Sequence, residues 1–353
     1  MKWIRWTLAV AALILIGWVS YILYLANAFR TLEPVAVAGC RQVEGVVGAE
    51  DITIAPEGRW AYLSSSDRRA LLAGKDPGPG AIYRYDLESD HPRPQKMELS
   101  PAMPFQPHGI SLFVAPDGVQ TLFVINHAGG QHRIDIFRIE GDRLIHRRTL
   151  TDPALISPND IAAISPNQAY VTNDHGFGNR RLQKMEDYLR LPLASVVYID
   201  EKGASVVADH LHYANGIQLS PRGDRVYVAG TTEPALRVYD RDPGTQQLTL
   251  DHTIALEAGP DNIELDRNGH LWVGAHPKLL AFTAHARDPK ALSPSAVLEI
   301  DPQAPEGERV TTRYLEEGQR MSGSSVGAVR GHRLLIGSVF EPLFLDCRLR
   351  EAP

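Results

Sequence analysis

The sequence has little cysteine, no large excess of either charge and no N-glycosylation acceptor. Its 353 residues include only two cysteines, Cys40 and Cys347, and the formal net charge is −6. A charged fraction of 22% beside 44% hydrophobic residues is an ordinary globular balance. This balance argues against a disordered chain and gives no electrostatic reason to expect nucleic acid as a partner. The absence of any Asn-x-Ser/Thr triplet fits a bacterial source.

Charge is missing altogether from the segment 6–26, WTLAVAALILIGWVSYILYLA. A helix of this length spans roughly 30 Å, the thickness of one bilayer core. Lys2 and Arg5 precede the segment, so the positive-inside rule favours a cytoplasmic N-terminus and a periplasmic or extracellular remainder. We predict a retained transmembrane signal-anchor over residues 1–30. Cleavage after Ala26-Asn27-Ala28 is the alternative.

After this segment, one pattern occurs six times. Each copy has a polar residue, a short apolar run, a turn with Gly, Pro or Asn, and a second apolar run, as in SPNDIAAISPNQAYVTNDHGF (157–177). The copies begin near residues 50, 108, 159, 215, 261 and 323. Irregular repeats of about 50 residues, built of short strands, predict an all-β fold. We therefore expect a six-bladed β-propeller over residues 31–353.

Five of the six copies open with an oxygen-bearing or imidazole side chain. These residues are Glu50, His108, Asn159, Asn215, and Asp261 with Asn262. The first strands of propeller blades start around a common axis, so these groups should converge at one mouth of the central tunnel. Carboxylate and amide oxygens, without thiolate, are the ligands that Ca²⁺ prefers. The alternative is that Asn and Asp cap turns at strand ends.

The two cysteines bracket the predicted propeller. In an exported protein, two cysteines at opposite ends favour a single disulfide, here between Cys40 and Cys347. That bond would lock the first strand to the last, and the chain-entropy model assigns so long a loop roughly 5 kcal/mol. The alternative is a pair of free thiols.

The chain resembles the paraoxonase (arylesterase/lactonase) family over about residues 38–349. The motifs that carry the resemblance, in the family's order and approximate spacing, are GAEDITI, PHGIS, INH, PNDIAAI, TNDHGF, YANGI, PDNIELD, LWVGAHP and LLIGSVF. The resemblance implies a calcium-dependent lactonase with arylesterase and phosphotriesterase side activities. For an exported protein beside a membrane, we expect lipophilic substrates such as N-acyl homoserine lactones. The resemblance also implies a disulfide at the corresponding ends of the propeller.

The same resemblance assigns roles to individual residues and implies two Ca²⁺ ions. The implied ligands of a catalytic Ca²⁺ are Glu50, Asn159, Asn215, Asp261 and Asn262. The implied ligands of a structural Ca²⁺ are Asp51, Asp160 and a backbone carbonyl near Ile110. His108 would be the base that activates water and His127 its partner, since imidazole titrates near neutrality. His175 and His276 match positions that line or support the pocket.

Two other segments bear on the substrate. Residues 64–80 match the family's loop at the mouth of the site, but a family tyrosine expected there is missing, which leaves the substrate preference open. In residues 180–192, apolar side chains at helical spacing predict a lid helix that also contacts the membrane. A solvated loop and a helix packed on its own blade are the respective alternatives.

Two other functions compete with a paraoxonase-like hydrolase. One is a gluconolactonase-like enzyme that acts on sugar lactones through a single metal ion, and the other is a calcium-stabilised binding propeller without catalysis. The adjacent pairs Glu50-Asp51 and Asn159-Asp160 and the histidines His108 and His127 favour the paraoxonase-like form. The partners expected are a small lactone or ester and, through the N-terminal helix, a membrane.

Overall fold

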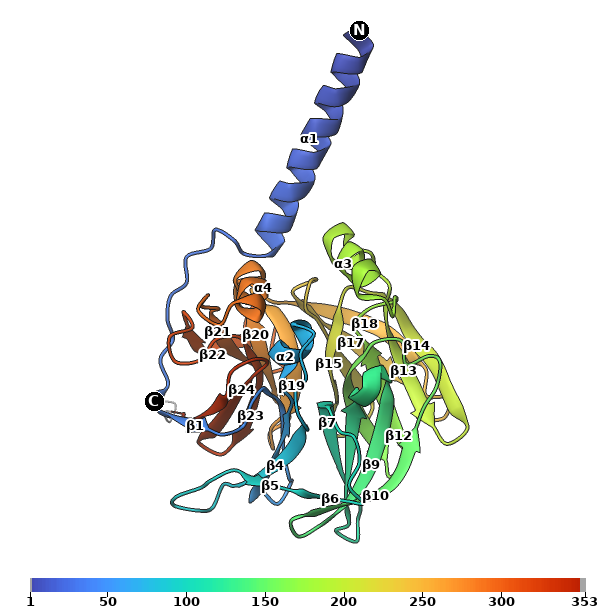
Figure 1. Cartoon of the computed structure of the whole chain (residues 1–353), viewed down its shortest axis with the longest axis vertical. Helices are drawn as coiled ribbons and strands as arrows, with labels where there is room; N and C mark the ends of the chain where they lie inside the picture. Colours follow the sequence, from blue (N-terminus) through green and yellow to red (C-terminus); the bar gives the residue numbers. More distant parts are fainter. Residues whose placement is uncertain (1, 350–353) are drawn as a thin grey trace.

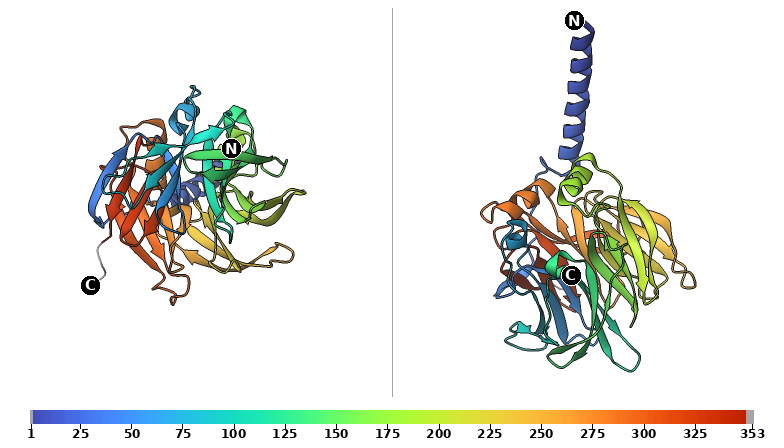
Figure 2. Two further views of the ribbon diagram at one scale, coloured as in Figure 1. Left: turned by 90° about the horizontal axis from the view of Figure 1, so that it is seen from below. Right: turned by 45° about the vertical axis from the view of Figure 1, so that its right-hand side comes forward.

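The computed structural model describes residues 2–349 and contains six small sheets arranged around one axis (Figures 1 and 2). Blade one contains β2 (Ala49–Ile54), β3 (Trp60–Ser65), β4 (Ala81–Asp86) and β5 (Gln95–Lys96). Blade two contains β7 (Pro107–Val114), β8 (Gln120–Asn126), β9 (Arg133–Glu140), β10 (Arg143–Leu150) and the added edge strand β6 (Glu98–Ser100). Blade three contains β11 (Pro158–Ser165), β12 (Gln168–Asn173), β13 (Ala194–Asp200) and β14 (Gly203–Leu211).

The remaining three blades complete the ring. Blade four contains β15 (Ala214–Leu219), β16 (Arg225–Gly230), β17 (Ala235–Arg241) and β18 (Leu248–Ala255). Blade five contains β19 (Gly259–Leu265), β20 (Leu271–His276), β21 (Ser295–Ile300) and β22 (Val310–Glu316). Blade six contains β23 (Ser324–Arg330), β24 (Arg333–Ser338), β25 (Leu343–Arg348) and, from the other end of the chain, β1 (Ala38–Glu44). The six-bladed propeller is confirmed, and every first strand begins within two residues of its predicted start.

The hydrophobic core is divided among the blade interfaces. Six clusters of buried side chains occur, and each joins residues of two neighbouring blades. In one of them, for example, Ile52 and Leu63 of blade one pack against Phe344 of blade six. Strands that are buried on both faces explain why the apolar runs of the sequence are short and nearly continuous. The first strands also contact one another in ring order, which brings their opening residues to the axis.

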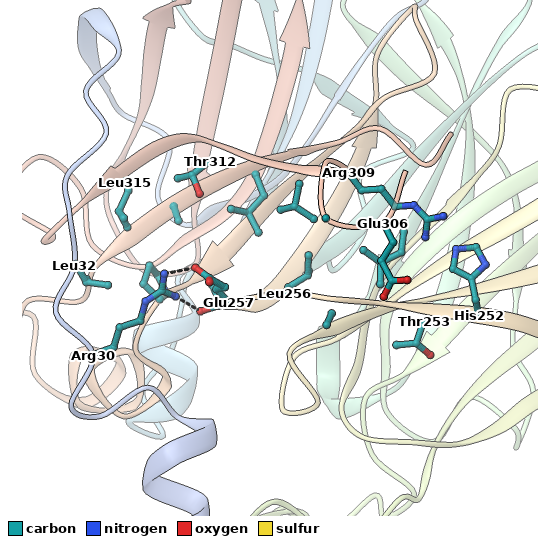
Figure 3. A pocket seen from close by; sticks show the side chains of 18 residues that line it. Arg30, Leu32, His252, Thr253, Leu256, Glu257, Glu306, Arg309, Thr312 and Leu315 are labelled. Carbon is teal, nitrogen blue, oxygen red and sulfur yellow. Dashed lines mark hydrogen bonds and ion pairs between the residues drawn. The ribbon is translucent and has the colours of Figure 1, made fainter. Parts of the chain in front are cut away.

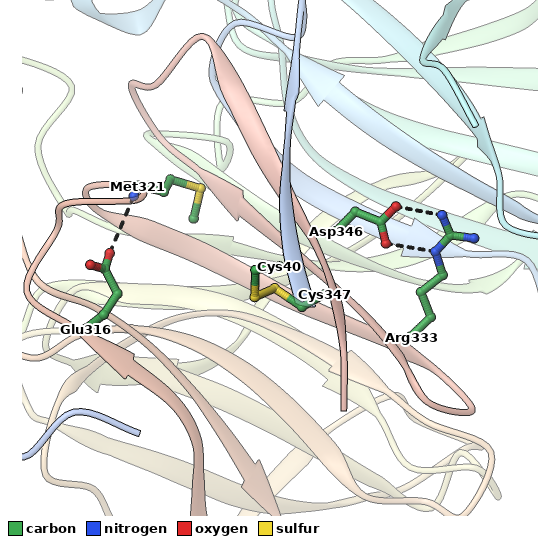
Figure 4. The surroundings of a disulfide bond; sticks show 6 residues. All are labelled: Cys40, Glu316, Met321, Arg333, Asp346 and Cys347. Atoms are coloured by element: carbon green, nitrogen blue, oxygen red, sulfur yellow. Dashed lines mark hydrogen bonds and ion pairs between the residues drawn. A yellow bond between two sulfur atoms is a disulfide. The ribbon is translucent and has the colours of Figure 1, made fainter. Parts of the chain in front are cut away.

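The ring closes in blade six, where both ends of the propeller chain meet. Strand β1 pairs with β25 in antiparallel register, Arg41 opposite Asp346. The predicted disulfide is confirmed: Cys40 and Cys347 are bonded across this pair, 307 residues apart in sequence (Figure 4). Beside it, Asp346 accepts hydrogen bonds from Arg333 Nη2 at 2.6 Å and Arg41 Nη2 at 3.1 Å. A covalent bond and a cluster of ion pairs therefore hold the same closure.

Three short helices lie at one end of the propeller. Helices α2 (Arg68–Leu72), α3 (Arg180–Leu189) and α4 (Leu279–Arg287) follow the second strands of blades one, three and five. In an antiparallel pair, the end of the second strand lies beside the start of the first, so all three helices border the mouth where the first strands begin. The side chain of Asn179 caps α3 by accepting from the backbone N–H of Arg181 at 2.9 Å.

The N-terminal helix α1 (Lys2–Leu25) projects from this same end, as Figure 1 shows. Among the residues described, Trp3–Leu25 forms the one helix that is long and apolar enough to cross a membrane. Trp18 Nε1 donates to the backbone carbonyl of Tyr188 in α3 at 3.1 Å. The linker that follows is tied to the propeller, because Val35 pairs with Leu315 and Arg30 forms an ion pair with Glu257.

Candidate functional site

A β-bulge recurs at the start of the first strand in each blade. The ladder between first and second strands shifts register between Ala49 and Ile52 in blade one, and at equivalent places in the other five blades. The predicted site residues of the first strands lie within these shifts or at their edge. A bulge re-aims side chains and leaves backbone groups unpaired, which is why bulges are common beside functional sites. The repeated bulge thus turns Glu50, Asn159 and Asn215 toward the axis.

Blades one and five meet through direct contact between predicted site residues. Asn262 Nδ2 donates to Glu50 Oε1 at 2.8 Å and to the Glu50 backbone carbonyl at 3.0 Å. The other carboxylate oxygen of Glu50 accepts from Arg68 Nη2 at 3.3 Å. Both Glu50 and Asn262 are buried. Residues more than two hundred positions apart are thereby brought into one cluster.

Three buried amide oxygens in this cluster have no hydrogen-bond partner. They are the Oδ1 atoms of Asn159, Asn215 and Asn262. In each residue the amide nitrogen is already committed: Asn159 Nδ2 donates to Asp174 Oδ2 at 3.2 Å, and Asn215 Nδ2 donates to Thr231 Oγ1 at 3.0 Å. An unpaired buried carbonyl oxygen costs about 1–3 kcal/mol. Three of them beside carboxylates fit the donor set of a hard cation such as Ca²⁺.

The buried negative charge of the cluster also indicates a cation site. Burial raises the pKa values of Asp51 and Asp160 well above that of an ordinary aspartate, and neighbouring carboxylates raise both values further. Burial likewise raises the pKa of Glu50, against the opposing charge of Arg68, and raises that of Asp261 to about 6. Several buried carboxylates that repel one another need positive charge to stay ionised. Arg68 supplies one such charge, so the cluster fits further cations.

The second group of predicted ligands has a different environment. Asp51 Oδ2 accepts from the backbone N–H of Ile110 at 2.7 Å, and Asp160 Oδ2 accepts from that of Ile217 at 2.8 Å. Each aspartate therefore joins its own blade to the next first strand. The structure brings Asp51, Asp160 and the Ile110 backbone together, and here the contact made by Ile110 is through its N–H. Unlike the three unpaired amide oxygens, these carboxylate oxygens each accept a hydrogen bond from a backbone N–H.

Two glycines allow the first strands to approach this closely. A Cβ at Gly109 would lie 2.6 Å from the backbone oxygen of Asn159 and 2.6 Å from Asp160 Oδ1. A Cβ at Gly216 would lie 2.4 Å from the backbone oxygen of Asp261. No side chain fits at such distances, so glycine at both positions is what lets neighbouring strands pack at the axis.

The predicted histidine pair meets on the same rim. His108 Nδ1 lies 3.0 Å from His127 Nε2, and the two rings are inclined at 65°. The other edge of the first ring faces the cluster, with His108 Nε2 3.6 Å from Glu50 Oε1. Burial, reinforced by the charge of Arg68, lowers the pKa of His108 to about 3. The imidazole is therefore neutral at pH 7 and has a free lone pair to accept a proton.

The other two predicted histidines occupy supporting positions. His276 Nε2 lies 2.9 Å from Asp261 Oδ2, and its buried ring stacks on Phe282 with centroids 3.8 Å apart. His175 bridges two carboxylates, with Nδ1 2.7 Å from Asp174 Oδ1 and Nε2 3.1 Å from Asp187 Oδ1. The second contact ties helix α3 to the end of strand β12. Both histidines thus orient neighbours of the cluster.

Sequence reasoning did not assign Arg68, Asp174 or His132 to the site. Arg68 begins α2, in the segment predicted as a loop, and donates to the backbone carbonyls of Gly48 and Pro107 as well as to Glu50. His132 contacts His127. The double arginine at 68–69 and the spacing of five between the two histidines were visible signals. The contacts that these arginines and histidines make could not be predicted from the sequence.

The letters G-x-S-x-G occur at 323–327 but do not form a nucleophile elbow. That motif requires a sharp strand-to-helix turn with an exposed serine. Here the segment leads into strand β23, and Ser325 is buried, with Oγ donating to the Glu50 backbone carbonyl at 2.6 Å. Ser325 is thus a structural support and does not have the geometry of a serine-hydrolase nucleophile.

A cavity of about 770 Å³ lies elsewhere, between blades four and five beneath the linker (Figure 3). Its wall combines apolar side chains such as Leu256, Leu298 and Leu315 with the Arg30–Glu257 ion pair. None of the predicted site residues lines it. The cavity is therefore separate from the cluster at the tunnel mouth.

Comparison with known proteins identifies the family. The family model described as Arylesterase matches residues 31–349. The chain is 35% identical to serum paraoxonase/arylesterase 1 of Homo sapiens over 333 residues, covering 92% of each chain. It is 34% identical to serum paraoxonase/arylesterase 2 of Rattus norvegicus over 325 residues, covering 89% of this chain and 90% of that one.

Solved structures show the likeness of fold. A gluconolactonase of Xanthomonas campestris superimposes with a TM-score of 0.57 at 16% identity, over 90% of this chain and 96% of that one. Since so low an identity speaks for the fold alone, the family rests on the sequence matches, which confirm the resemblance to paraoxonases. The chain belongs to the arylesterase family of ester hydrolases.

Proposed function

We propose that this enzyme is a calcium-dependent hydrolase of lactones and aryl esters. The observation that carries the proposal is the set of three unpaired, buried amide oxygens on Asn159, Asn215 and Asn262, next to carboxylates and on the same rim as His108. Amide and carboxylate oxygens are calcium ligands, and a neutral histidine is a general base. The metal ligands and the general base that a metal-assisted hydrolase requires would thus lie at one place.

Two ions are proposed. The catalytic Ca²⁺ would be held by the five side chains Glu50, Asn159, Asn215, Asp261 and Asn262. The structural Ca²⁺ would be held by Asp51, Asp160 and a backbone carbonyl near Ile110. Burial and neighbouring carboxylates raise the pKa of both aspartates, and the positive charge of the ion would let them stay ionised. When bound, the catalytic ion supplies Lewis-acid stabilisation of the negative charge that develops on the substrate carbonyl oxygen.

The protein's own groups handle the proton. His108 Nε2 faces the cluster and would take a proton from the attacking water. The contact between His108 Nδ1 and His127 Nε2 would hold the proton of His108 on Nδ1, which leaves Nε2 free as the base. The low pKa of His108, caused by burial and Arg68, keeps it unprotonated before the reaction. His276 and Phe282 would hold Asp261 in place by hydrogen bonding and stacking.

Lipophilic substrates are proposed because the rim of the site carries exposed apolar side chains. On α3, Leu182 is 40%, Met185 54% and Tyr188 61% exposed. This helix contacts α1, which we propose remains as a membrane anchor (residues 1–30) with the propeller (31–353) on the periplasmic or extracellular side. A site that opens beside a bilayer is suited to long-chain lactones, N-acyl homoserine lactones among them. Phosphotriester cleavage is a proposed side activity, since its transition state also places charge on an oxygen.

A substrate panel with metal control tests the proposal. Hydrolysis of phenyl acetate and of acyl lactones should stop in excess EDTA and return with Ca²⁺, and His108→Gln should lower kcat about 10²–10⁴-fold. The exposed His91 provides a matched control, and His91→Gln should behave as wild type. Full activity after metal removal would refute the proposal. Turnover of sugar lactones alone would favour a gluconolactonase-like enzyme, and calcium binding without any turnover would favour a binding propeller.

A further inference from the structure

A third histidine extends the pair of His108 and His127 away from the ligand cluster. His127 Nδ1 lies 2.9 Å from His132 Nδ1, and the two rings meet edge to face at 89°, with centroids 5.0 Å apart. The opposite edge of His127, at Nε2, is the one that contacts His108 at 3.0 Å. The three imidazoles therefore form one continuous hydrogen-bonded chain, with His127 in the middle.

The local backbone explains how two histidines five residues apart come into contact. Between them, Gly129 and Gly130 have φ values of 71° and 70°, in the left-handed region that glycine adopts without strain. The short 3-10 turn η1 (Ala128–Gly130) reverses the chain, and strand β9 then begins at Arg133. His132 is thus held at the end of a strand, partly exposed to solvent.

We propose that His132 is the outlet of a three-histidine proton relay, exchanging protons between His127 Nδ1 and bulk solvent. This inference rests on the proposed function, in which His108 and His127 activate water. It adds a residue that neither the sequence nor the family assignment singles out. His132 would not touch the substrate, so its role is to position His127 and to carry the proton outward.

The proton positions balance over one turnover. At rest, His127 carries its proton on Nδ1 and donates it to the lone pair of His132 Nδ1. When a proton reaches His127 Nε2, the Nδ1 proton moves to His132, and His132 releases one proton from Nε2 to solvent. As the ester bond breaks, the leaving alkoxide takes a proton from the inner end of the chain, and the transfers run in reverse. Each ring then regains its starting tautomer.

The surroundings make His132 the better place for a transient positive charge. Burial lowers the pKa of His127 well below its usual value, and the neighbouring His108 and His132 lower it further. Burial also lowers the pKa of His132, but less than that of His127, and the carboxylate of Asp174 opposes the effect at both rings. Arg133, the adjacent cation, is paired with Asp135 at 3.2 Å. The relay thus ends at a ring that is partly exposed to solvent and whose pKa is less depressed than that of His127.

The test uses His132→Ala and His132→Gln in the full chain, with phenyl acetate as substrate. Both variants should lower kcat about tenfold, less than loss of the base itself, with little change in KM. External imidazole should restore most of the rate of His132→Ala, because a diffusing base replaces the missing ring. His132→Gln can still hydrogen-bond to His127 but cannot carry a proton, so it should stay slow. His91→Gln, in an exposed loop, is the control that should need no rescue.

The outcomes separate this inference from the proposed function. If His108→Gln and His127→Gln lose activity while both His132 variants keep the wild-type kcat, the relay ends at His127 and the inference fails alone. A loss in His132→Ala that imidazole does not restore, together with a lower melting temperature, assigns His132 to structure and overturns the relay. If His108→Gln itself retains full activity, the failure lies in the proposed function.

Discussion

Asn262 Nδ2 donates a hydrogen bond to Glu50 Oε1 at 2.8 Å, although 212 residues separate them. Glu50 opens the first blade and Asn262 opens the fifth, so their contact crosses the mouth of the tunnel. The amide oxygen of the same Asn262 has no partner. This arrangement, with the amide nitrogen bonded to Glu50 and the amide oxygen buried without a partner, leads to the first prediction.

Removal of calcium should destabilise the propeller as well as abolish activity. Without a cation, the buried carboxylates at the axis repel one another and the amide oxygens stay unsatisfied. At a calcium concentration one thousand times Kd, binding stabilises the folded state by about 4 kcal/mol. Calorimetry should therefore show a much higher melting temperature in millimolar Ca²⁺ than in EDTA. Equal melting temperatures in the two conditions would contradict a calcium site of useful affinity.

Gly109→Ala should destabilise the protein by about 1–3 kcal/mol and weaken calcium binding. The new Cβ would lie 2.6 Å from Asp160 Oδ1 and from the Asn159 backbone oxygen, so one first strand must move. Gly178→Ala is a matched control, because the nearest atom to its Cβ is 3.9 Å away. Denaturant unfolding and calcium titration measure both effects. Identical behaviour of the two variants would show that the close approach at Gly109 is not needed.

The double variant Cys40→Ser/Cys347→Ser should lower the free energy of unfolding by about 2–5 kcal/mol. The disulfide joins β1 to β25 and so constrains a loop of 307 residues in the unfolded chain. Activity at 25 °C should be retained, since the cysteines lie in blade six, away from the ligand cluster. The Arg41–Asp346 ion pair still joins β1 to β25 in the variant. Unchanged stability in urea would mean that pairing of the strands alone suffices.

His175 should make stability fall at alkaline pH. Burial lowers the pKa of His175, but hydrogen bonds to Asp174 and Asp187 have a larger, opposite effect, so that the pKa is raised to about 10. The ordinary value is about 6.5, so this stabilisation is fully present below pH 6.5 and is lost as pH rises through about 10. The difference in melting temperature between wild type and His175→Gln should therefore shrink between pH 8 and 11. A constant difference over that range would show that His175 is not charged in the folded protein.

The sequence alone was sufficient for the number of blades, the disulfide, the N-terminal helix and the family. Each of these depends on a local or countable feature: the six repeats, the two cysteines, the uncharged run over 6–26, and motifs such as PNDIAAI. Strand starts were also predictable, because Asn159 and Asn215 stand directly before apolar runs. Periodicity and turn residues act over a few positions, so they can be recognised without knowing the contacts.

The tertiary structure decided which atoms meet at the axis. Three contacts depend on the blades closing into a ring. Asn262 donates its amide nitrogen to Glu50, Arg68 forms an ion pair with Glu50, and His132 completes a chain of imidazoles. Such contacts join distant residues through packing and repeated bulges, and no local pattern encodes their direction. The residue types could be read from the chain, whereas their orientation and partners came only from the closed propeller.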